Sequence, residues 1–246
     1  MAGDKSSPLA QFEIKPLIEF DFLGLSFDLT NSGLVMLIST LTAVFLLLFA
    51  TRKVEIVPGK PQLAAEFFYN FVKDMLVENT GTKGLKFFPL AFCLFMFVLF
   101  SNLFGMIPYS FTATSHIIIT FALAAFLFLV IVTAALIKHG KKFFTIFLPS
   151  GTPMWLAPLL VAIELLAYLI RPVSLAIRLA ANMTAGHTML KVIAGFILPL
   201  GFIGGWLPLL FLVILTGFEI FVAILQAYIF TMLACVYLSD AVELHH

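Results

Sequence analysis

The sequence predicts an all-α integral membrane protein. We expect five transmembrane helices and one amphipathic interfacial helix, with the last two spans long and strongly tilted. Of the 246 residues, 62% are hydrophobic, 11% are charged and 29 are phenylalanine, whereas soluble domains are about 45–50% apolar. Several uncharged runs are long enough to cross a bilayer. The net charge of +1 and the absence of a basic block exclude a nucleic-acid-binding protein.

The first three spans and the interfacial helix follow from the distribution of charge. Residues 34–50 are uncharged and predict a span at the short end of the usual length. Residues 62–78 place apolar and charged side chains on opposite faces at helical spacing, which predicts an amphipathic helix in the membrane interface. Residues 87–107 and 117–137 are uncharged, and their short linker predicts antiparallel, neighbouring spans.

The last two apolar runs, residues 157–197 and 207–239, are too long to cross a bilayer upright. A helix over the first run would be about 60 Å long, against about 30 Å of hydrocarbon. Either both helices tilt strongly or the first one breaks near Pro172, which lacks a backbone donor. Residues 143–155 are apolar but interrupted by proline and glycine, and we interpret them as an interfacial or re-entrant segment.

We assign residues 1–30 to an N-terminal extension and residues 31–246 to a single membrane domain. Basic residues gather in the connections at 51–86 and 138–142, and the other two connections between spans contain none. The positive-inside rule then places the C-terminus in the cytoplasm or matrix. With five spans, the N-terminus lies on the opposite side.

The sequence predicts neither a cofactor nor a metal site. Cys93 and Cys235 lie inside apolar runs without metal-binding spacing, so we expect two buried free thiols. The motifs of serine hydrolases, phosphate-binding loops and metalloproteases do not occur, and we expect no catalytic residue. His116 and His139 are expected to be loop residues without a functional role.

Arg178 lies near the centre of the run 157–197. A charged side chain at this depth costs about 2.5–3.5 kcal/mol on insertion scales, so it is a functional candidate by default. Arginine keeps its proton in proteins and cannot relay one by losing it. It therefore needs an acidic partner. On an ideal helix the polar residues of this run fall on one stripe, which consists of Glu164, Arg171, Ser174, Arg178, Asn182 and Gly186.

A second set of polar residues suggests a proton relay on the outer side. His187 points away from the stripe of Arg178, and Glu219 shares a face of the last run with Gln226. Imidazole has an ordinary pKa near 6.5 and can exchange protons with a carboxyl group held away from water. The candidates for an inner path are Glu164, Arg171, Ser174 and Asp240. The pattern predicts two half-paths separated by a fixed cation.

Structural roles remain as alternatives for several of these residues. Arg171 could anchor its helix at the interface, with Glu164 as its ion-pair partner. His187 could be a structural histidine, and Asn182 and Gln226 could form interhelical hydrogen bonds. For the whole chain, the alternatives are a proton- or cation-coupled secondary transporter, which would favour repeated halves, and a structural scaffold. No repeat is visible in the sequence.

Three segments resemble subunit a of the F-type ATP synthase. They are SNLFGMIPYSFTATSH at 101–116, RPVSLAIRLAANMTAGH at 171–187 and FEIFVAILQAYIF at 218–230. The resemblance extends over most of the chain from about residue 31. It implies a stator subunit, not catalytic by itself, that forms two proton half-channels against the rotating c-ring and couples proton translocation to rotation. The implied partners are the c-ring, the b subunits of the peripheral stalk and the lipid bilayer.

The resemblance also implies roles for single residues. Arg178 matches the family's essential arginine and Asn182 its nearby asparagine, while Glu219 and Gln226 match the polar pair of the last helix. His187 and Glu219 stand in the reverse order to some bacterial relatives, which resembles the mitochondrial and alphaproteobacterial branch. This implies a multi-pass protein of the bacterial inner membrane, with a periplasmic N-terminus, or alternatively of the mitochondrial inner membrane.

Overall fold

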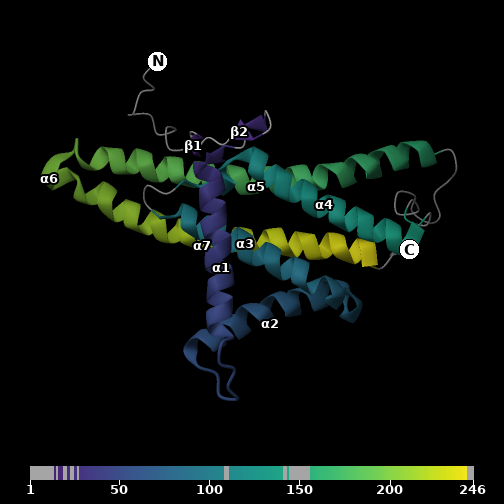
Figure 1. The fold of residues 1–246 in the computed structure, drawn as a ribbon. Coiled ribbons are helices and arrows are strands. Elements are labelled where there is room, and N and C mark those ends of the chain that lie inside the picture. Colours follow the sequence, from purple (N-terminus) through teal and green to yellow (C-terminus); the bar gives the residue numbers. More distant parts are fainter. Residues whose placement is uncertain are drawn as a thin grey trace.

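The computed structural model describes residues 14, 16–18, 21–22, 25–26, 28–107, 111–140, 143 and 156–242. Within these ranges the protein is all-α apart from short strands at its N-terminal end (Figure 1). Five helices are long and apolar enough to cross a membrane, which confirms the predicted fold class. The predicted segment 143–155 and the side chain of Asp240 lie outside the described part of the chain.

The described part of the N-terminal extension forms two small antiparallel strand pairs, and the first helix follows directly. Strand β1 (Pro16–Ile18) pairs with β4 (Leu29–Thr30), and β2 (Asp21–Phe22) pairs with β3 (Leu25–Ser26). The hydroxyl of Thr30 then accepts a 3.3 Å hydrogen bond from the backbone N–H of Gly33. This N-cap explains why helix α1 (Asn31–Ala50) begins three residues before Leu34, the first residue of the predicted span.

Helix α2 (Lys60–Thr80) is amphipathic, as predicted. Its buried face carries Val72, Met75 and Leu76, while Asp74 and Glu78 are exposed. Pro61 begins the helix, and Gly81, with a φ of 64°, ends it. The chain continues through the 3-10 helix η2 (Thr82–Phe87) into helix α3 (Phe88–Gly105).

The segment after α3 contains the 3-10 turn η3 (Ala113–Ser115) and leads into helix α4 (Ile117–His139). Helix α3 packs chiefly against α7 and α1, whereas α4 packs chiefly against α5. The prediction that these two spans are close neighbours is therefore wrong. Helix α7 contacts both α3 and α4. A short linker keeps the ends of two helices close, but it does not require the two helices to pack against each other along their length.

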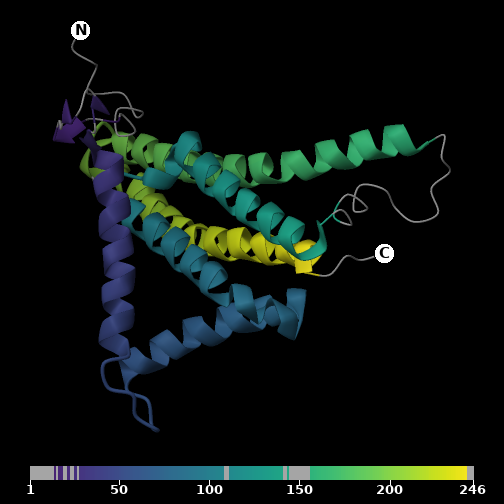
Figure 2. The same ribbon diagram turned by 45° about the vertical axis from the view of Figure 1, so that its right-hand side comes forward.

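The two longest helices form a hairpin that extends across the direction of α1 (Figures 1 and 2). Helix α5 (Ala157–Ile197) is continuous through Pro172, so the alternative of a break near this residue is not found. The short helix α6 (Gly201–Gly204) connects it to α7 (Trp206–Val242), which packs against α5. The long pair is strongly inclined relative to α1, as expected for helices longer than the bilayer is thick.

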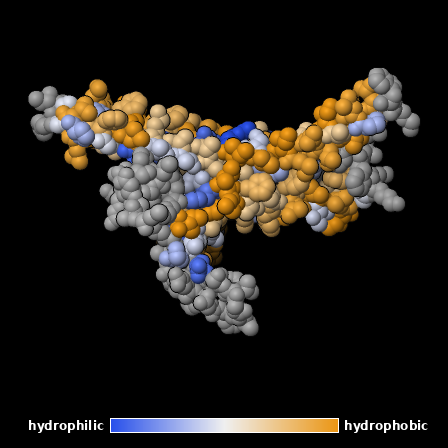
Figure 3. Space-filling view, turned by 90° about the horizontal axis from the view of Figure 1, so that it is seen from above, coloured by the Kyte–Doolittle hydropathy of each residue, from blue (hydrophilic) through white to orange (hydrophobic). Residues whose placement is uncertain are grey.

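The core lies between α7 and the helices that pack against it, α2, α3, α4 and α5, and the outer faces of the helices remain apolar. Leu179 and Phe230 are each 1% exposed, whereas Phe45 is 66% exposed. Apolar surface predominates along the long dimension of the molecule (Figure 3). Cys235 is buried as expected, but Cys93 is exposed on α3, so the prediction for Cys93 is wrong. An uncharged helix does not reveal which of its faces meets the protein.

Candidate functional site

The predicted polar stripe of α5 lies partly on its outward face. Ser174, Arg178 and Asn182 follow one another at intervals of one turn, and all three are exposed. The opposite face of the same turns is buried in the bundle, and it includes Leu175 and Leu179. Since helix packing places the arginine outward, it is available to a neighbouring molecule.

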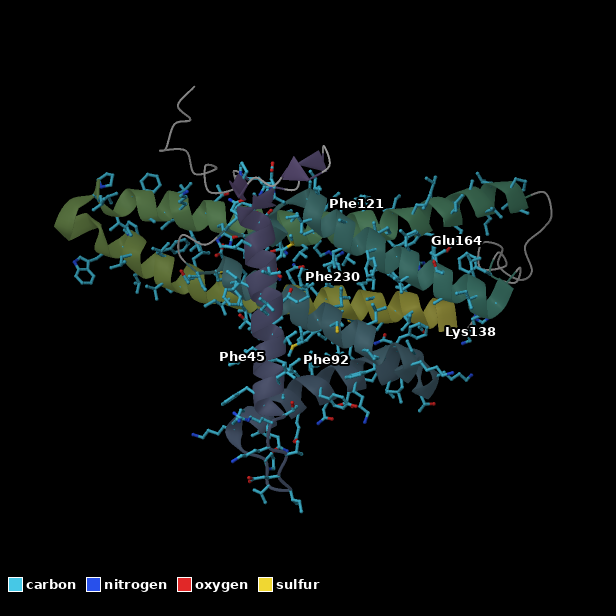
Figure 4. All side chains as sticks on the ribbon, in the orientation of Figure 1. Phe45, Phe92, Phe121, Lys138, Glu164 and Phe230 are labelled. Carbon is cyan, nitrogen blue, oxygen red and sulfur yellow. The ribbon has the colours of Figure 1, made fainter. Side chains whose placement is uncertain are left out.

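Arg178 has no partner within the described ranges. Its guanidinium makes no hydrogen bond or ion pair with any residue described by the structure. Glu164, the nearest acid on the stripe, is half-buried on the N-terminal third of α5 (Figure 4) and is likewise without an ion pair there. The alternative in which Glu164 pairs with Arg171 is therefore not found.

Arg171 occupies a different environment, although it belongs to the same predicted stripe. Its Cζ lies 5.2 Å from the ring centroid of Tyr168 on α5 and 5.2 Å from that of Tyr237 on α7. These are cation–π distances. The guanidinium therefore connects α5 to α7, in contrast to the outward guanidinium of Arg178.

Glu219, on α7, packs against α5 at Gly186. The side chain is 8% exposed, and neither carboxyl oxygen has a hydrogen-bond partner among the described residues. An added Cβ at Gly186 would overlap Oε1 of Glu219 and lie 2.8 Å from its Cδ. Glycine at position 186 is therefore what allows the carboxyl group to pack against α5.

His187, the next residue on α5, faces the segment that connects α3 to α4. Its Nε2 lies 3.2 Å from the hydroxyl oxygen of Thr112. One turn earlier, the hydroxyl of Thr184 donates a 3.1 Å hydrogen bond to the carbonyl of Ser115. His187 thus points away from the outward face of Arg178, as predicted, and the structure places it directly beside the contact of Glu219 with Gly186.

Further buried polar side chains lie on α3 and in the segment that connects α3 to α4, and they were not among the predicted site residues. Asn102, on α3, is fully buried and donates a 3.1 Å hydrogen bond from Nδ2 to the carbonyl of Ala223 on α7. Among the described residues, the buried side-chain atoms without a partner are Ser101 Oγ, Asn102 Oδ1, Thr114 Oγ1, His116 Nε2 and both carboxyl oxygens of Glu219. Buried polar groups are normally paired. We call the buried and half-buried polar residues of this region the polar junction: Asn102, Thr112, Ser115, Thr184, His187 and Glu219.

For Asn102, Thr112 and Ser115, the only sequence signal was the resemblance of the segment 101–116. His116, which we expected to be an ordinary loop residue, stacks on Phe111 with ring centroids 5.1 Å apart and buries its Nε2. A linker rich in serine and threonine has no helical period. The sequence therefore could not indicate which hydroxyl group reaches α5.

The remaining predicted residues are placed less closely together. Gln226 is 4% exposed on the same side of α7 as Glu219, with the fully buried Ala223 between them. Among the inner candidates, Ser174 is exposed while Arg171 is packed between tyrosines. The structure thus places Glu219 against Gly186, the neighbour of His187, and of the inner candidates whose side chains are described it packs Arg171 inward while Ser174 faces outward.

A metal site and a polar ligand pocket are not found in the described ranges. No group of three His, Cys, Asp or Glu residues there could hold a metal ion. A cleft of about 490 Å³ lies between α5 and α7 near their connection, and its lining is apolar, including Phe196, Leu207 and Phe211. It provides no acid, base or ligand.

Comparison with known families shows a match over most of the chain. The family model described as ATP synthase A chain matches residues 33–239. The match begins in α1 and ends in α7, so it includes all five long helices and the polar junction.

Proposed function

Because the chain belongs to the ATP synthase A chain family, we propose that Arg178 is the fixed cation separating two proton paths through this protein. Members of the family are the proton-translocating a subunit of the membrane sector of ATP synthase. The subunit is not catalytic by itself, spans the membrane several times and acts together with the c-ring. This function accounts for a charge in an apolar helix. A structural scaffold gives such a charge no role, and a secondary transporter would favour repeated halves, which the sequence does not show.

The exposure of Arg178 is the single observation that carries this proposal. Placing the charge near the middle of an apolar helix costs about 2.5–3.5 kcal/mol, and no described residue of the chain offsets that cost. A carboxylate carried past this face by a ring subunit would do so. A permanently protonated arginine also repels a proton, so it prevents direct passage between the two paths.

The polar junction supports His187 and Glu219 as the outer proton path. His187 belongs to α5, and the carboxyl group of Glu219, which belongs to α7, packs against Gly186, the residue that precedes His187. A carboxylic acid donates a proton and an imidazole accepts one, so they can act in sequence. Asn182 lies one turn beyond Arg178 on α5, and the buried Gln226 continues the path along α7.

We assign the inner path to Glu164, Arg171, Ser174 and Asp240. Ser174 supports this assignment, because it is exposed one turn from Arg178 on the same face of α5. Arg171 holds α5 against α7 through the two tyrosine rings. Its role is therefore to position the helix that carries Arg178.

The proposal extends to the surroundings of the subunit. Residues 31–246 form one membrane domain, residues 1–30 an extension on the periplasmic side, and the C-terminus is cytoplasmic, in accord with the basic connections. The order of His187 and Glu219 supports the alphaproteobacterial and mitochondrial branch, and hence the bacterial or the mitochondrial inner membrane. Exposed apolar side chains such as Phe45 meet lipid, and the b subunits complete the stator.

The test is the substitution Arg178→Ala in the intact complex, reconstituted into vesicles. We expect ATP-driven proton pumping to be lost, because a ring carboxylate then has no cation to face and the two paths are no longer separated. Arg52→Ala is the matched control, since Arg52 is an exposed arginine in the α1–α2 connection. Undiminished pumping by the Arg178→Ala complex would exclude the proposed role.

A further inference from the structure

Thr112 connects the end of α3 to His187. The residue is 3% exposed, and its hydroxyl group reaches two partners. Oγ1 donates to the carbonyl oxygen of Gly105 across 3.4 Å and lies 3.2 Å from Nε2 of His187. One hydroxyl group therefore joins the last residue of α3 to the imidazole on α5.

Gly105 provides the space for this contact. An added Cβ at position 105 would lie 2.7 Å from Cγ2 and 3.1 Å from Oγ1 of Thr112. Gly105 is also the last residue of α3, where backbone carbonyls lack a partner within the helix. Its carbonyl oxygen is therefore an acceptor for the hydrogen of the threonine hydroxyl.

The chemistry of a hydroxyl group then determines the state of the imidazole. A hydroxyl has one hydrogen to donate and two lone pairs that accept. If the hydrogen goes to Gly105, only a lone pair of Thr112 Oγ1 faces His187, and Nε2 must carry a hydrogen to complete the bond. A neutral imidazole protonated at Nε2 has its free lone pair at Nδ1.

We infer that Thr112 is a positioning residue that holds neutral His187 in the tautomer protonated at Nε2, leaving Nδ1 to accept the proton. The inference rests on the proposed role of His187 in the outer path. The other ionisable groups that the described elements bring to this region are Glu219 from α7, His116 from the segment before α4 and the exposed Lys191 one turn further along α5. Helix α3 contributes the neutral Ser101 and Asn102.

The substitution Thr112→Val tests the inference without removing the segment from α5. Valine keeps the shape of threonine and lacks only the hydroxyl group. The hydrogen bond from Thr184 to Ser115 still attaches the segment to α5 one turn away. Thr112→Ser restores the hydroxyl, and Thr133→Val is the matched control, because the hydroxyl of Thr133 bonds only within its own exposed helix face.

The first measurement is the ¹⁵N spectrum of the histidine rings in the intact complex, with the signal of His187 identified by its loss in a His187→Gln variant. We expect Nε2 to be protonated and Nδ1 to be unprotonated in the unmodified, Thr112→Ser and Thr133→Val complexes. In Thr112→Val, both tautomers should be present. A neutral ring protonated at Nδ1 in the unmodified complex, or an unchanged ring in Thr112→Val, would overturn the inference.

The second measurement is the rate of ATP-driven proton pumping. Loss of one hydrogen bond predicts a decrease of roughly threefold to tenfold for Thr112→Val, with Thr112→Ser and Thr133→Val close to the unmodified complex. If Thr112→Val and Thr112→Ser pump equally well, the hydroxyl group has no positioning role. If instead His187→Gln pumps normally, the proposed function of His187 fails, while the tautomer in the spectrum still decides the contact with Thr112.

Discussion

The substitution Gly186→Ala tests whether Glu219 must pack against α5. The added methyl group would overlap Oε1 of Glu219 and lie 2.8 Å from Cδ and 3.2 Å from Cγ, so the carboxyl group must move. Overpacking of this kind costs about 1–3 kcal/mol. If that cost raises the activation free energy of proton transfer, the pumping rate decreases by roughly fivefold to a hundredfold. Each 1.4 kcal/mol corresponds to about a factor of ten. Alanine favours the helix itself by about 1 kcal/mol, so α5 should still fold.

The assay is ATP-driven proton pumping by the reconstituted complex, with the amount of assembled complex measured in parallel. Gly195→Ala is the matched control, because Gly195 lies on the same helix and an added Cβ there would meet nothing within 4 Å. In a Gly186→Ala complex, the shorter side chain of Glu219→Asp should restore part of the lost pumping. Equal pumping by the Gly186→Ala and Gly195→Ala complexes would refute the reasoning that the position of Glu219 matters.

Two further predictions concern other parts of the chain. Arg171→Lys should lower the temperature at which the subunit leaves the complex. The reason is that a compact ammonium group cannot lie flat against the two tyrosine rings. Unchanged thermal stability would show that these contacts contribute nothing. Gln62→Ala should increase the rate of trypsin cleavage at Arg52 and Lys53 several-fold, because Gln62 exchanges two 3.1 Å hydrogen bonds with the backbone of Glu55. Cleavage should occur only from the cytoplasmic side of the membrane, and cleavage from the opposite side would contradict the proposed orientation.

The sequence predicted the bounds of the helices better than it predicted which helices pack against one another. The predicted run 157–197 coincides with α5, since a long apolar run bounded by proline and glycine is a local signal. The start of α1 was missed by three residues, because the N-cap Thr30 and the polar residues Asn31 and Ser32 lie outside the apolar run. The adjacency of α3 and α4 was wrong, and so was the burial of Cys93. Both depend on which face of an evenly apolar helix packs inward, and such a helix has no polar face to indicate this.

The sequence by itself determined the membrane class, the number of long helices and the polar stripe with Arg178, because hydropathy and helical period are properties of neighbouring residues. The tertiary structure alone decided that Arg171 packs between tyrosines while Arg178 faces outward. It alone also placed Glu219 against Gly186 and Thr112 against His187. These contacts join segments that are far apart in the chain. They depend on close approaches at Gly186 and Gly105, where the absence of a Cβ leaves room for a carboxyl group and for a hydroxyl group.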